Sequence, residues 1–243
     1  LKASAGGGGK GMRIVRKNSE LEENFNAAKS ESKKSFGDDR VFIEKYIEQP
    51  RHIEIQILCD KHGNQIHLGE RECSIQRRYQ KVIEECPSPF VDEEMRNEMA
   101  AQALTLAKEV KYDSAGTVEF VVDANKNFYF LEMNTRLQVE HPVSELVTGV
   151  DLVEQMIYCA DNKKLNISQK DINLKGWSVE SRIYAEDPTK DFLPSIGRVT
   201  EYIEPSKIED KDQTIRNDTG INPGSEVSLS LIHISEPTRP IAI

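Results

Sequence analysis

Several features are scarce in this 243-residue sequence, and each scarcity excludes a class of protein. Its cysteines, Cys59, Cys73, Cys86 and Cys159, are scattered without a C-x-x-C pair, which favours free thiols in a reducing compartment over disulfides or a zinc site. Basic residues are outnumbered 41 to 32, and the net charge of −9 argues against a nucleic-acid partner and against an anionic membrane surface. No apolar run approaches a membrane span, and no signal peptide is visible. The composition predicts a soluble, globular protein with one large or two modest domains.

Chemistry-bearing residues are concentrated in one short segment, residues 132–140, with the sequence EMNTRLQVE. Its alternate residues are polar: Glu132, Asn134, Arg136, Gln138 and Glu140. In an extended backbone all five would project to one side. Carboxylates, amides and a guanidinium in one row indicate a site for a metal and a small anion. The alternative is an amphipathic strand with a solvated face.

A β-hairpin is predicted just before this segment. Residues 118–123 (VEFVVD) and 128–133 (FYFLEM) flank the turn-rich residues 124–127. A turn symmetric about them pairs Asp123 with Phe128 and places Glu119 opposite Glu132. The other, apolar face would carry Val118, Phe120, Val122, Tyr129, Leu131 and Met133. Facing carboxylates repel unless a divalent cation lies between them, and oxygen ligands alone favour Mg²⁺ or Mn²⁺. Solvated carboxylates at a strand end are the alternative.

A glycine run occupies residues 6–11, GGGGKG. It does not open a helix, as a dinucleotide fingerprint must, and Gly11 stands where a P-loop needs Ser or Thr. A strand is expected at residues 12–15 instead. The run is therefore interpreted as a loop between strands whose backbone N–H groups and Lys10 close over phosphates, or as a plain flexible loop.

The remaining elements follow an α+β pattern with many antiparallel hairpins. Helices are expected at residues 19–36, where Ser19 begins a capping box, at 92–110, and from Asp151 onward. Strands are expected at 41–46, at 52–58, after the turn at residues 60–64 through Leu68, and at 176–185 and 198–203. This order does not form a repeating βαβ array.

Strings along the chain resemble the ATP-grasp core of biotin carboxylases. They are LKASAGGGGKGMR, FIEKYIEQPRHIEIQ, ERECSIQRRYQKVIEE, GTVEF, FLEMNTRLQVEHPV and SVESRIYAEDP. The resemblance runs from Leu1 to about Val227 and implies an ATP-grasp fold, with a lid subdomain at 1–46, an antiparallel-sheet catalytic core at 47–167 and the start of the family's C-terminal domain at 176–227. Within the family, the sequence is most similar to α-subunits of propionyl-CoA carboxylase, with acetyl-CoA and methylcrotonyl-CoA carboxylases as alternatives.

The resemblance also implies residue roles. The nucleotide would be bound by Lys2, Gly7, Gly8, Gly9, Glu44, Lys45, Tyr46, Ile47, His52, Gln76 and Tyr79, the last a position that is often His or Asn in relatives. The metal would be held by Glu119, Glu132 and Asn134. Bicarbonate would be bound by Lys81, Arg136, Gln138 and Val139. Glu140 would be the general base, and Arg182 would stabilise the biotin enolate, so that Glu140, Arg136, Lys81 and Arg182 form the catalytic group.

The implied activity is that of a ligase, which carboxylates biotin with ATP and bicarbonate through carboxyphosphate. Implied cofactors are ATP, Mg²⁺ or Mn²⁺, and biotin on a biotin carboxyl carrier domain. A carboxyltransferase β-subunit and an oligomeric enzyme are implied as well, located in the cytoplasm of a bacterium or in the mitochondrial matrix. Two alternatives stay open: another ATP-grasp ligase, such as one similar to carbamoyl-phosphate synthetase, and a non-catalytic nucleotide-binding domain.

Two departures from the family bear on activity. Relatives carry a further domain before the residue that corresponds to Leu1, and residues 228–243 (SLSLIHISEPTRPIAI) do not match the family and are interpreted as foreign. The sequence is therefore expected to be a truncated piece that is inactive by itself.

Overall fold

We describe residues 1–5, 11–206 and 213–228 from a computed structural model. Two compact units follow one another along the chain, the first ending at Arg182 and the second beginning at Ile183. No helix in these described ranges is long and apolar enough to cross a membrane. The glycine run at residues 6–10 and nearly all of the segment after Val227 lie outside the described ranges.

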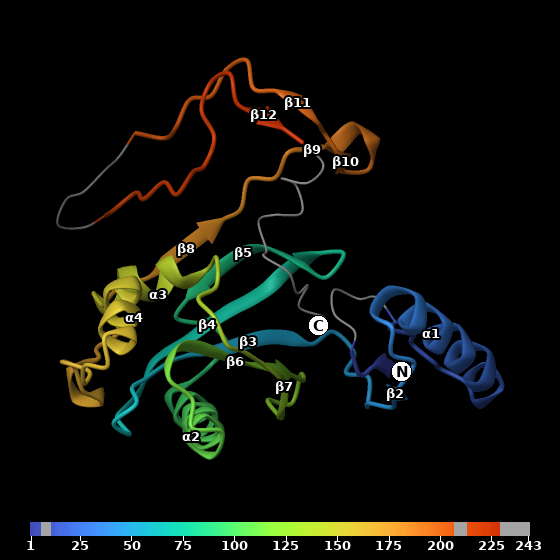
Figure 1. The fold of residues 1–243 in the computed structure, drawn as a ribbon, viewed down its shortest axis with the longest axis horizontal. Helices are drawn as coiled ribbons and strands as arrows, with labels where there is room; N and C mark the ends of the chain where they lie inside the picture. The colour runs from blue at the N-terminus through green and yellow to red at the C-terminus, as the bar shows by residue number, and fades with distance from the viewer. Residues whose placement is uncertain (6–10, 207–212, 229–243) are drawn as a thin grey trace. The chain divides into compact units, whose positions relative to one another are not determined.

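The first unit is built on an antiparallel six-stranded sheet with the order β7-β6-β3-β4-β5-β8 (Figure 1). Its strands are β3 (Arg51–Cys59), β4 (Gln65–Arg77), β5 (Gln80–Cys86), β6 (Ser114–Val122), β7 (Phe128–Asn134) and β8 (Ser178–Ser181). The helices of this unit beyond β5 are α2 (Glu93–Glu109), α3 (His141–Thr148) and α4 (Leu152–Ala160), with a 3-10 turn at Gln169–Asp171. The α+β, hairpin-rich pattern predicted from the sequence is confirmed.

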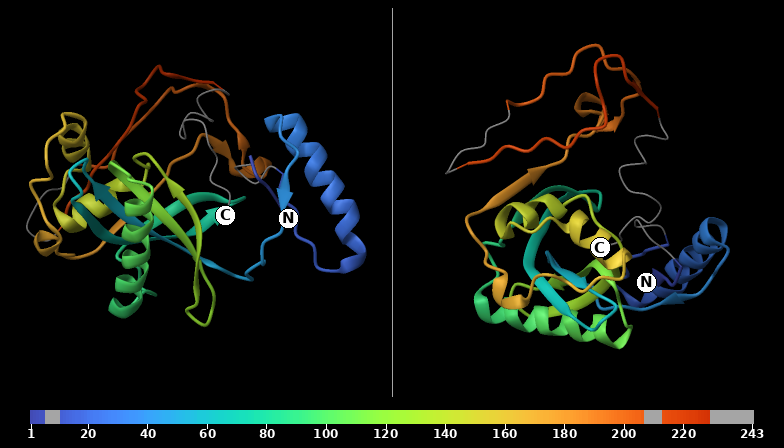
Figure 2. Two further views of the ribbon diagram at one scale, coloured as in Figure 1. Left: turned by 60° about the horizontal axis from the view of Figure 1, so that its bottom comes forward. Right: turned by 60° about the vertical axis from the view of Figure 1, so that its left-hand side comes forward.

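Helices cover both faces of the sheet, with α2 on one side and α3 and α4 on the other (Figure 2). On the α2 side, Ile53, Ile55 and Ile57 of β3 pack with Val118 and Phe120 of β6 in the main hydrophobic core. This burial follows from alternation along a strand, which turns every second side chain to the same face. Helix α2 begins where predicted, because the Asp92 side chain accepts a hydrogen bond from the Met95 backbone N–H.

The opposite face of β3 is also buried, although its residues are mostly polar. His52, Glu54 and Gln56 are 2%, 0% and 0% exposed. Farther along the same face, Leu58 packs on Leu152 of α4. A strand buried on both sides was not evident from the clean alternation of HIEIQIL, which is typical of one wet face.

Two register shifts decide which side chains face this polar side. Strand β4 has an irregularity between the pairs Ile57↔His67 and Ile55↔Glu70, at Gly69 with φ of 79°. This φ lies in the left-handed region that glycine adopts without strain. Beyond the shift, Arg71 is paired with Glu54, so that Arg71 and Leu68 lie on the same face although they are three positions apart.

The second shift lies in the predicted hairpin. Near the turn, Val122 pairs with Phe128, so the predicted pairing of Asp123 with Phe128 is wrong, because the turn is one residue larger. An irregularity after Phe120 then restores the predicted pair Glu119↔Glu132. The predicted apolar face holds for β6, whereas on β7 Phe128 and Met133 pack on the core and Tyr129 is 39% exposed.

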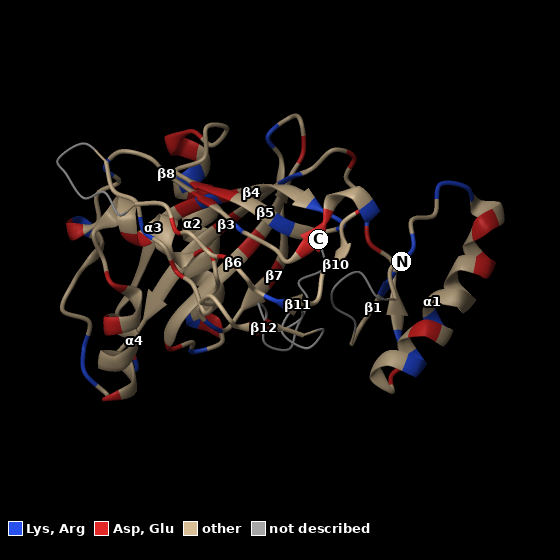
Figure 3. Cartoon of the chain, turned by 90° about the horizontal axis from the view of Figure 1, so that it is seen from above, with Lys and Arg blue, Asp and Glu red and all other residues tan. Residues whose placement is uncertain are grey.

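The N-terminal segment forms a small layer of its own. Strand β1 (Lys2–Ala3) pairs with β2 (Val41–Phe42), and α1 (Leu21–Phe36) follows a 3-10 turn at Asn18–Glu20. Helix α1 carries charged residues of both signs along its length (Figure 3). Its predicted end at Phe36 is confirmed, but the predicted cap at Ser19 is wrong, because Glu20 is the capping residue and makes no side-chain capping bond.

Two predicted strands are shorter than expected in this segment. The strand predicted at 12–15 is reduced to one bridge between Met12 and Lys2, and that predicted at 41–46 ends at Phe42. Neither segment has a continuous partner strand, and a strand without ladder bonds is not stable.

The second unit contains only short strands. β9 (Glu186–Asp187) pairs with β10 (Leu193–Pro194), and β11 (Gly197–Arg198) with β12 (Glu226–Val227), while a 3-10 turn spans Pro188–Lys190. The strand predicted at 198–203 is thus confined to its first residue, and that predicted at 176–185 to Ser178–Ser181.

Candidate active site

A cluster of buried charged side chains lies on the face of the sheet opposite α2. Its members come from β3, β4, β5, β6, the segment between β7 and α3, and the position directly after β8, and they are His52, Glu54, Arg71, Lys81, Glu84, Glu119, Gln138, Glu140 and Arg182. Such residues are rarely buried unless they are paired. The structure shows how each charge in this cluster is compensated.

Lys81 is the centre of the cluster and is 4% exposed. Its Nζ lies 2.7 Å from Glu54 Oε2, 3.1 Å from Glu119 Oε1 and 2.6 Å from Glu140 Oε1. Burial acts to lower the pKa of Lys81, but the three carboxylates raise it well above its usual value. Lys81 therefore carries a fixed positive charge.

Glu140 lies between two cations. One oxygen accepts from Lys81, and the other, Oε2, accepts from Arg182 Nη2 at 2.8 Å. Burial acts to raise the pKa of Glu140, but the charges of Lys81, Arg182 and Arg71 together outweigh it, so the pKa is lowered. Glu140 is therefore ionised, with one cation on each carboxylate oxygen.

Arg182 is held from its other side by Glu84. Arg182 Nε lies 2.6 Å from Glu84 Oε1, and Glu84 is fully buried. Burial raises the pKa of Glu84 to about 7 despite this ion pair. Glu84 is also paired across the sheet with Glu180 of β8, whose pKa burial and Glu84 raise to about 8.

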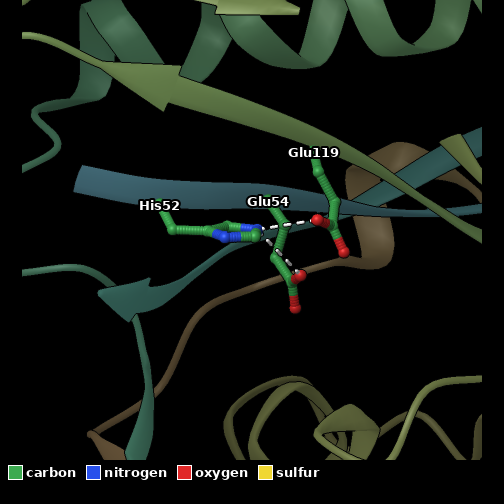
Figure 4. Close-up of side chains that lie close together, drawn as sticks. All are labelled: His52, Glu54 and Glu119. Carbon is green, nitrogen blue, oxygen red and sulfur yellow. Dashed lines mark ion pairs between the residues drawn. The ribbon is translucent and has the colours of Figure 1, made fainter. Parts of the chain in front are cut away.

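Glu119 is approached by donors at both carboxylate oxygens. Its Oε1 accepts from Lys81, from Asn134 Nδ2 at 2.9 Å and from Gln138 Nε2 at 2.8 Å. Its Oε2 lies 2.8 Å from His52 Nε2, and Figure 4 shows the imidazole directed at both Glu119 and Glu54. His52 Nδ1 lies 3.2 Å from Gln76 Nε2, which joins two residues of the predicted nucleotide site.

Glu132 lacks such compensation. Burial, and next the charge of the facing Glu119, raise the pKa of Glu132 to about 7. Glu119 faces Glu132, and Asn134 lies beside Glu119; the carboxylate and amide oxygens of these three side chains are ligands that a hard divalent cation prefers. The residues predicted to hold a metal therefore fit such an ion.

The predicted row of side chains along an extended backbone is wrong beyond Asn134. Strand β7 ends there, and a loop leads to Glu140, which precedes α3. Gln138 and Glu140 reach the cluster because this loop folds back over the sheet, where Gln138 is 2% exposed. In the same loop, Arg136 Nη1 donates to the carbonyl of Leu137 at 3.3 Å, and Val139 is 38% exposed.

The predicted nucleotide residues are spread more widely. Lys2, on β1, lies 3.6 Å from Glu44, which follows β2 by two residues, and Lys2 also acts electrostatically on Glu132. Residues 43–50, which include Lys45, Tyr46 and Ile47, form no regular element. Tyr79 lies in the turn between β4 and β5 and is 51% exposed. Gly7, Gly8 and Gly9 lie outside the described residues.

Sequence reasoning missed three members of the cluster: Glu54, Arg71 and Glu84. Glu54 was recognised as a polar residue of an alternating strand, but not as a buried one. Arg71 and Glu84 lie in the quoted strings ERECSIQ and KVIEE, next to other charged residues, and no local signal there marks them as buried.

Free thiols were predicted, and all four cysteines are free and buried. Burial raises the pKa of Cys59 and Cys86 to about 12, so these thiols are not reactive nucleophiles.

Comparison with known proteins identifies the family. The sequence profile of the carbamoyl-phosphate synthase L chain, ATP binding domain, matches residues 1–168, and that of the biotin carboxylase C-terminal domain matches residues 180–231. The chain belongs to the biotin carboxylase family. Glu140 lies in the first match and Arg182 in the second, so the cluster joins residues of both.

Relatives and solved structures agree with this assignment. The chain is 61% identical to the propionyl-CoA carboxylase alpha chain of Ruegeria pomeroyi, with 94% of this chain and 36% of the relative aligned. It is 60% identical to the mitochondrial propionyl-CoA carboxylase alpha chain of Homo sapiens, covering 94% and 31%.

One solved structure is the biotin carboxylase domain of Hydrogenobacter thermophilus 2-oxoglutarate carboxylase in complex with MgADP, ADP and bicarbonate. It matches with a TM-score of 0.88 and 50% identity, over 94% of this chain and 49% of that one. This likeness confirms the predicted ATP-grasp fold. The chain spans about a third of the length of the curated relatives.

Proposed function

We propose that the protein of which this chain forms the biotin carboxylase core catalyses ATP-dependent carboxylation of biotin by bicarbonate. This is the first half-reaction of a propionyl-CoA carboxylase or a related acyl-CoA carboxylase. One observation carries the proposal: Glu140 is buried between Lys81 and Arg182, at 2.6 Å and 2.8 Å. A carboxylate that two fixed cations hold in place is suited to take a proton from an anion bound by the same cations.

The two cations control the basicity of Glu140. Without an anion they lower its pKa, which makes Glu140 a weak base. When bicarbonate binds, it competes with Glu140 for Lys81 and Arg182, and the pKa of Glu140 rises. The carboxylate thus becomes a better base when its substrate is present.

Arg182 has a second use in this scheme. A guanidinium stays charged at every relevant pH and presents a planar set of donors. Glu84 and Glu140 hold it from two sides, so it is oriented before a substrate arrives. We propose that it stabilises the enolate oxygen of the biotin ureido group.

The nucleotide would lie toward the end of the sheet marked by His52 and Gln76. The structure of the Hydrogenobacter relative contains MgADP, and in this chain Glu119, Glu132 and Asn134 are the residues that would hold Mg²⁺ or Mn²⁺. Such an ion offsets charge on the phosphates. By the family resemblance, further proposed nucleotide contacts are Lys2, Tyr79 and residues 44–47. Further proposed bicarbonate contacts are Arg136, Gln138 and Val139.

The proposal extends to partners. A biotin carboxyl carrier domain would deliver biotin, and a carboxyltransferase subunit would accept the carboxyl group, in an oligomeric enzyme. Curated relatives include a bacterial protein and mitochondrial ones, so the proposed location is the bacterial cytoplasm or the mitochondrial matrix.

The test uses a segment exchange. Residues 1–227 replace the matching segment of the Ruegeria α chain, and ATP hydrolysis is measured with and without bicarbonate and free biotin. We expect bicarbonate-dependent hydrolysis that biotin stimulates. Glu140→Gln should lower this turnover about 100-fold or more and leave ATP binding intact, because the amide keeps the shape but accepts no proton.

Two outcomes would contradict the proposal. Hydrolysis that needs no bicarbonate and ignores biotin would indicate another ATP-grasp ligase. ATP binding without turnover in the exchanged enzyme would indicate a nucleotide-binding domain.

A further inference from the structure

Arg71 is the largest fully buried side chain of the described residues, and it has no role in the scheme above. It lies on β4, opposite Glu54 of β3. Its N–H groups donate to five acceptors on different parts of the first unit. These are Glu54 Oε1 at 2.5 Å, Gln56 Oε1 at 2.6 Å, Ser144 Oγ at 3.0 Å, Thr117 Oγ1 at 3.2 Å and Gln138 Oε1 at 3.0 Å.

This number of acceptors matches the chemistry of the side chain. A guanidinium has five N–H donors in a fixed plane and no acceptor. One acceptor for each donor removes the cost of burying unsatisfied polar groups. Because the plane is rigid, the five acceptors are also fixed relative to one another.

Two of these hydrogen bonds continue into the candidate active site. Glu54 accepts from Arg71 with Oε1 and from Lys81 with Oε2 at 2.7 Å. The second path runs through Gln138. Its Oε1 accepts from Arg71, and its Nε2 therefore faces Glu119 Oε1, at 2.8 Å.

The same arrangement defines the orientation of the Gln138 amide. An amide whose oxygen is occupied by a fixed donor cannot rotate without leaving that donor facing an NH₂ group. Arg71 thus fixes one side of Lys81 through Glu54, and it fixes Gln138 at the end of the loop that carries Glu140.

We propose that Arg71 is a positioning residue for the bicarbonate subsite, a role that rests on the proposed function. It contacts no reactant. It orients the Glu54 carboxylate, which positions Lys81, and it orients the Gln138 amide directly. Lys81 and Gln138 are the residues that would contact the anion. Among the described residues, no direct contact joins Arg71 to the nucleotide side of the site at His52 and Gln76. The link through Glu54 is long, because Glu54 Oε2 lies 3.9 Å from His52 Nε2, so we expect a smaller effect of Arg71 on that side.

Arg71→Lys in the exchanged enzyme tests the proposal. The ammonium keeps the charge but has three donors and no planar fork. We expect the KM for bicarbonate to rise about tenfold or more while the KM for ATP changes less than about twofold. A uniform effect on both constants, or no effect on either, would overturn the proposal.

Arg96→Lys is the matched control. Arg96 also pairs with a buried glutamate of β4, Glu70, through its Nη2 at 2.8 Å, but it does so on the α2 side of the sheet. This variant should lower the melting temperature without separating the two KM values. A bicarbonate-specific effect from Arg96→Lys as well would show that any loosening of β4 suffices, which would also overturn the proposal.

A gentler variant keeps the test decisive if Arg71→Lys fails to fold. Ser144→Ala with Thr117→Val removes two acceptors of Arg71 and leaves the paths through Glu54 and Gln138 in place. The bicarbonate KM should rise by about two- to fivefold with the ATP KM unchanged, and unchanged values for both would count against the role.

One readout is independent of turnover. In the 243-residue chain, the Arg71 Nε–H should exchange slowly with solvent in a ¹⁵N NMR spectrum, because it is fully buried and bonded to Glu54. Fast exchange would refute the geometry itself. If the α chain that carries residues 1–227 without further substitution shows no bicarbonate-dependent turnover, the proposed function fails. The NMR measurement would still test whether Arg71 is buried and bonded to Glu54.

Discussion

The carboxyl groups of Glu84 and Glu180 form a pair whose cost to the fold depends on pH. They lie opposite each other on β5 and β8. Burial raises both pKa values, that of Glu84 to about 7 and that of Glu180 to about 8. Glu180 is only half-buried at the sheet edge and is the residue to change, because Glu84 also holds Arg182 at 2.6 Å. The perturbation is Glu180→Gln.

The expected direction follows from proton linkage. A carboxyl group with a raised pKa in the folded state retains its proton there longer than in the unfolded chain. The extra stability is full below about pH 4.5 and is lost as the pH rises through about 8. Each pKa unit is worth about 1.4 kcal/mol, so complete ionisation of Glu180 costs at most about 5 kcal/mol, and screening by solvent reduces this to about 2 kcal/mol. Glu180→Gln removes that cost.

Urea unfolding of the 243-residue chain measures the effect between pH 5 and pH 9. The single tryptophan, Trp177, directly precedes β8 and donates to Glu85 at 3.0 Å, so its fluorescence reports on this edge. The variant should match the parent near pH 5 and be more stable by about 2 kcal/mol at pH 9. Glu94→Gln, an exposed position on α2, makes the same charge change as a control. A difference that is constant across this pH range would refute the reasoning.

Three further predictions concern single residues. Glu119→Gln should destabilise the metal-free chain by about 1–3 kcal/mol, because Lys81 and His52 lose a charged partner. It should also erase most of the gain in melting temperature that MgADP gives over ADP with a chelator. A full Mg²⁺-dependent gain in the variant would exclude Glu119 as a ligand. Arg182→Lys in the exchanged enzyme should lower biotin-stimulated turnover about 100-fold, because an ammonium cannot bridge Glu84 and Glu140 as the fork does, and near-normal turnover would contradict that bridging role. Asp92→Ala should lower the free energy of unfolding by about 1 kcal/mol, since the Met95 N–H loses its cap, with an unchanged urea midpoint as the contrary result.

Local patterns in the sequence determined much of the fold. Helices α2 and α4 begin at Asp92 and Asp151 as predicted, and in the structure each Asp side chain accepts from the backbone N–H three residues on. The facing pair Glu119↔Glu132 was also predicted, since strand alternation and a turn locate it to within one residue. The family resemblance, which depends on residue strings alone, supplied the fold and Lys81, Glu140 and Arg182.

Only the tertiary structure decided how the charges are compensated. No local pattern shows that β4 shifts register at Gly69 and so pairs Arg71 with Glu54, or that the loop after Asn134 folds back and bonds Gln138 to both Arg71 and Glu119. The physical reason is that alternation specifies which residues share a face only within a regular strand. A bulge or a loop changes the face, and the partners that satisfy a buried charge come from strands distant in sequence.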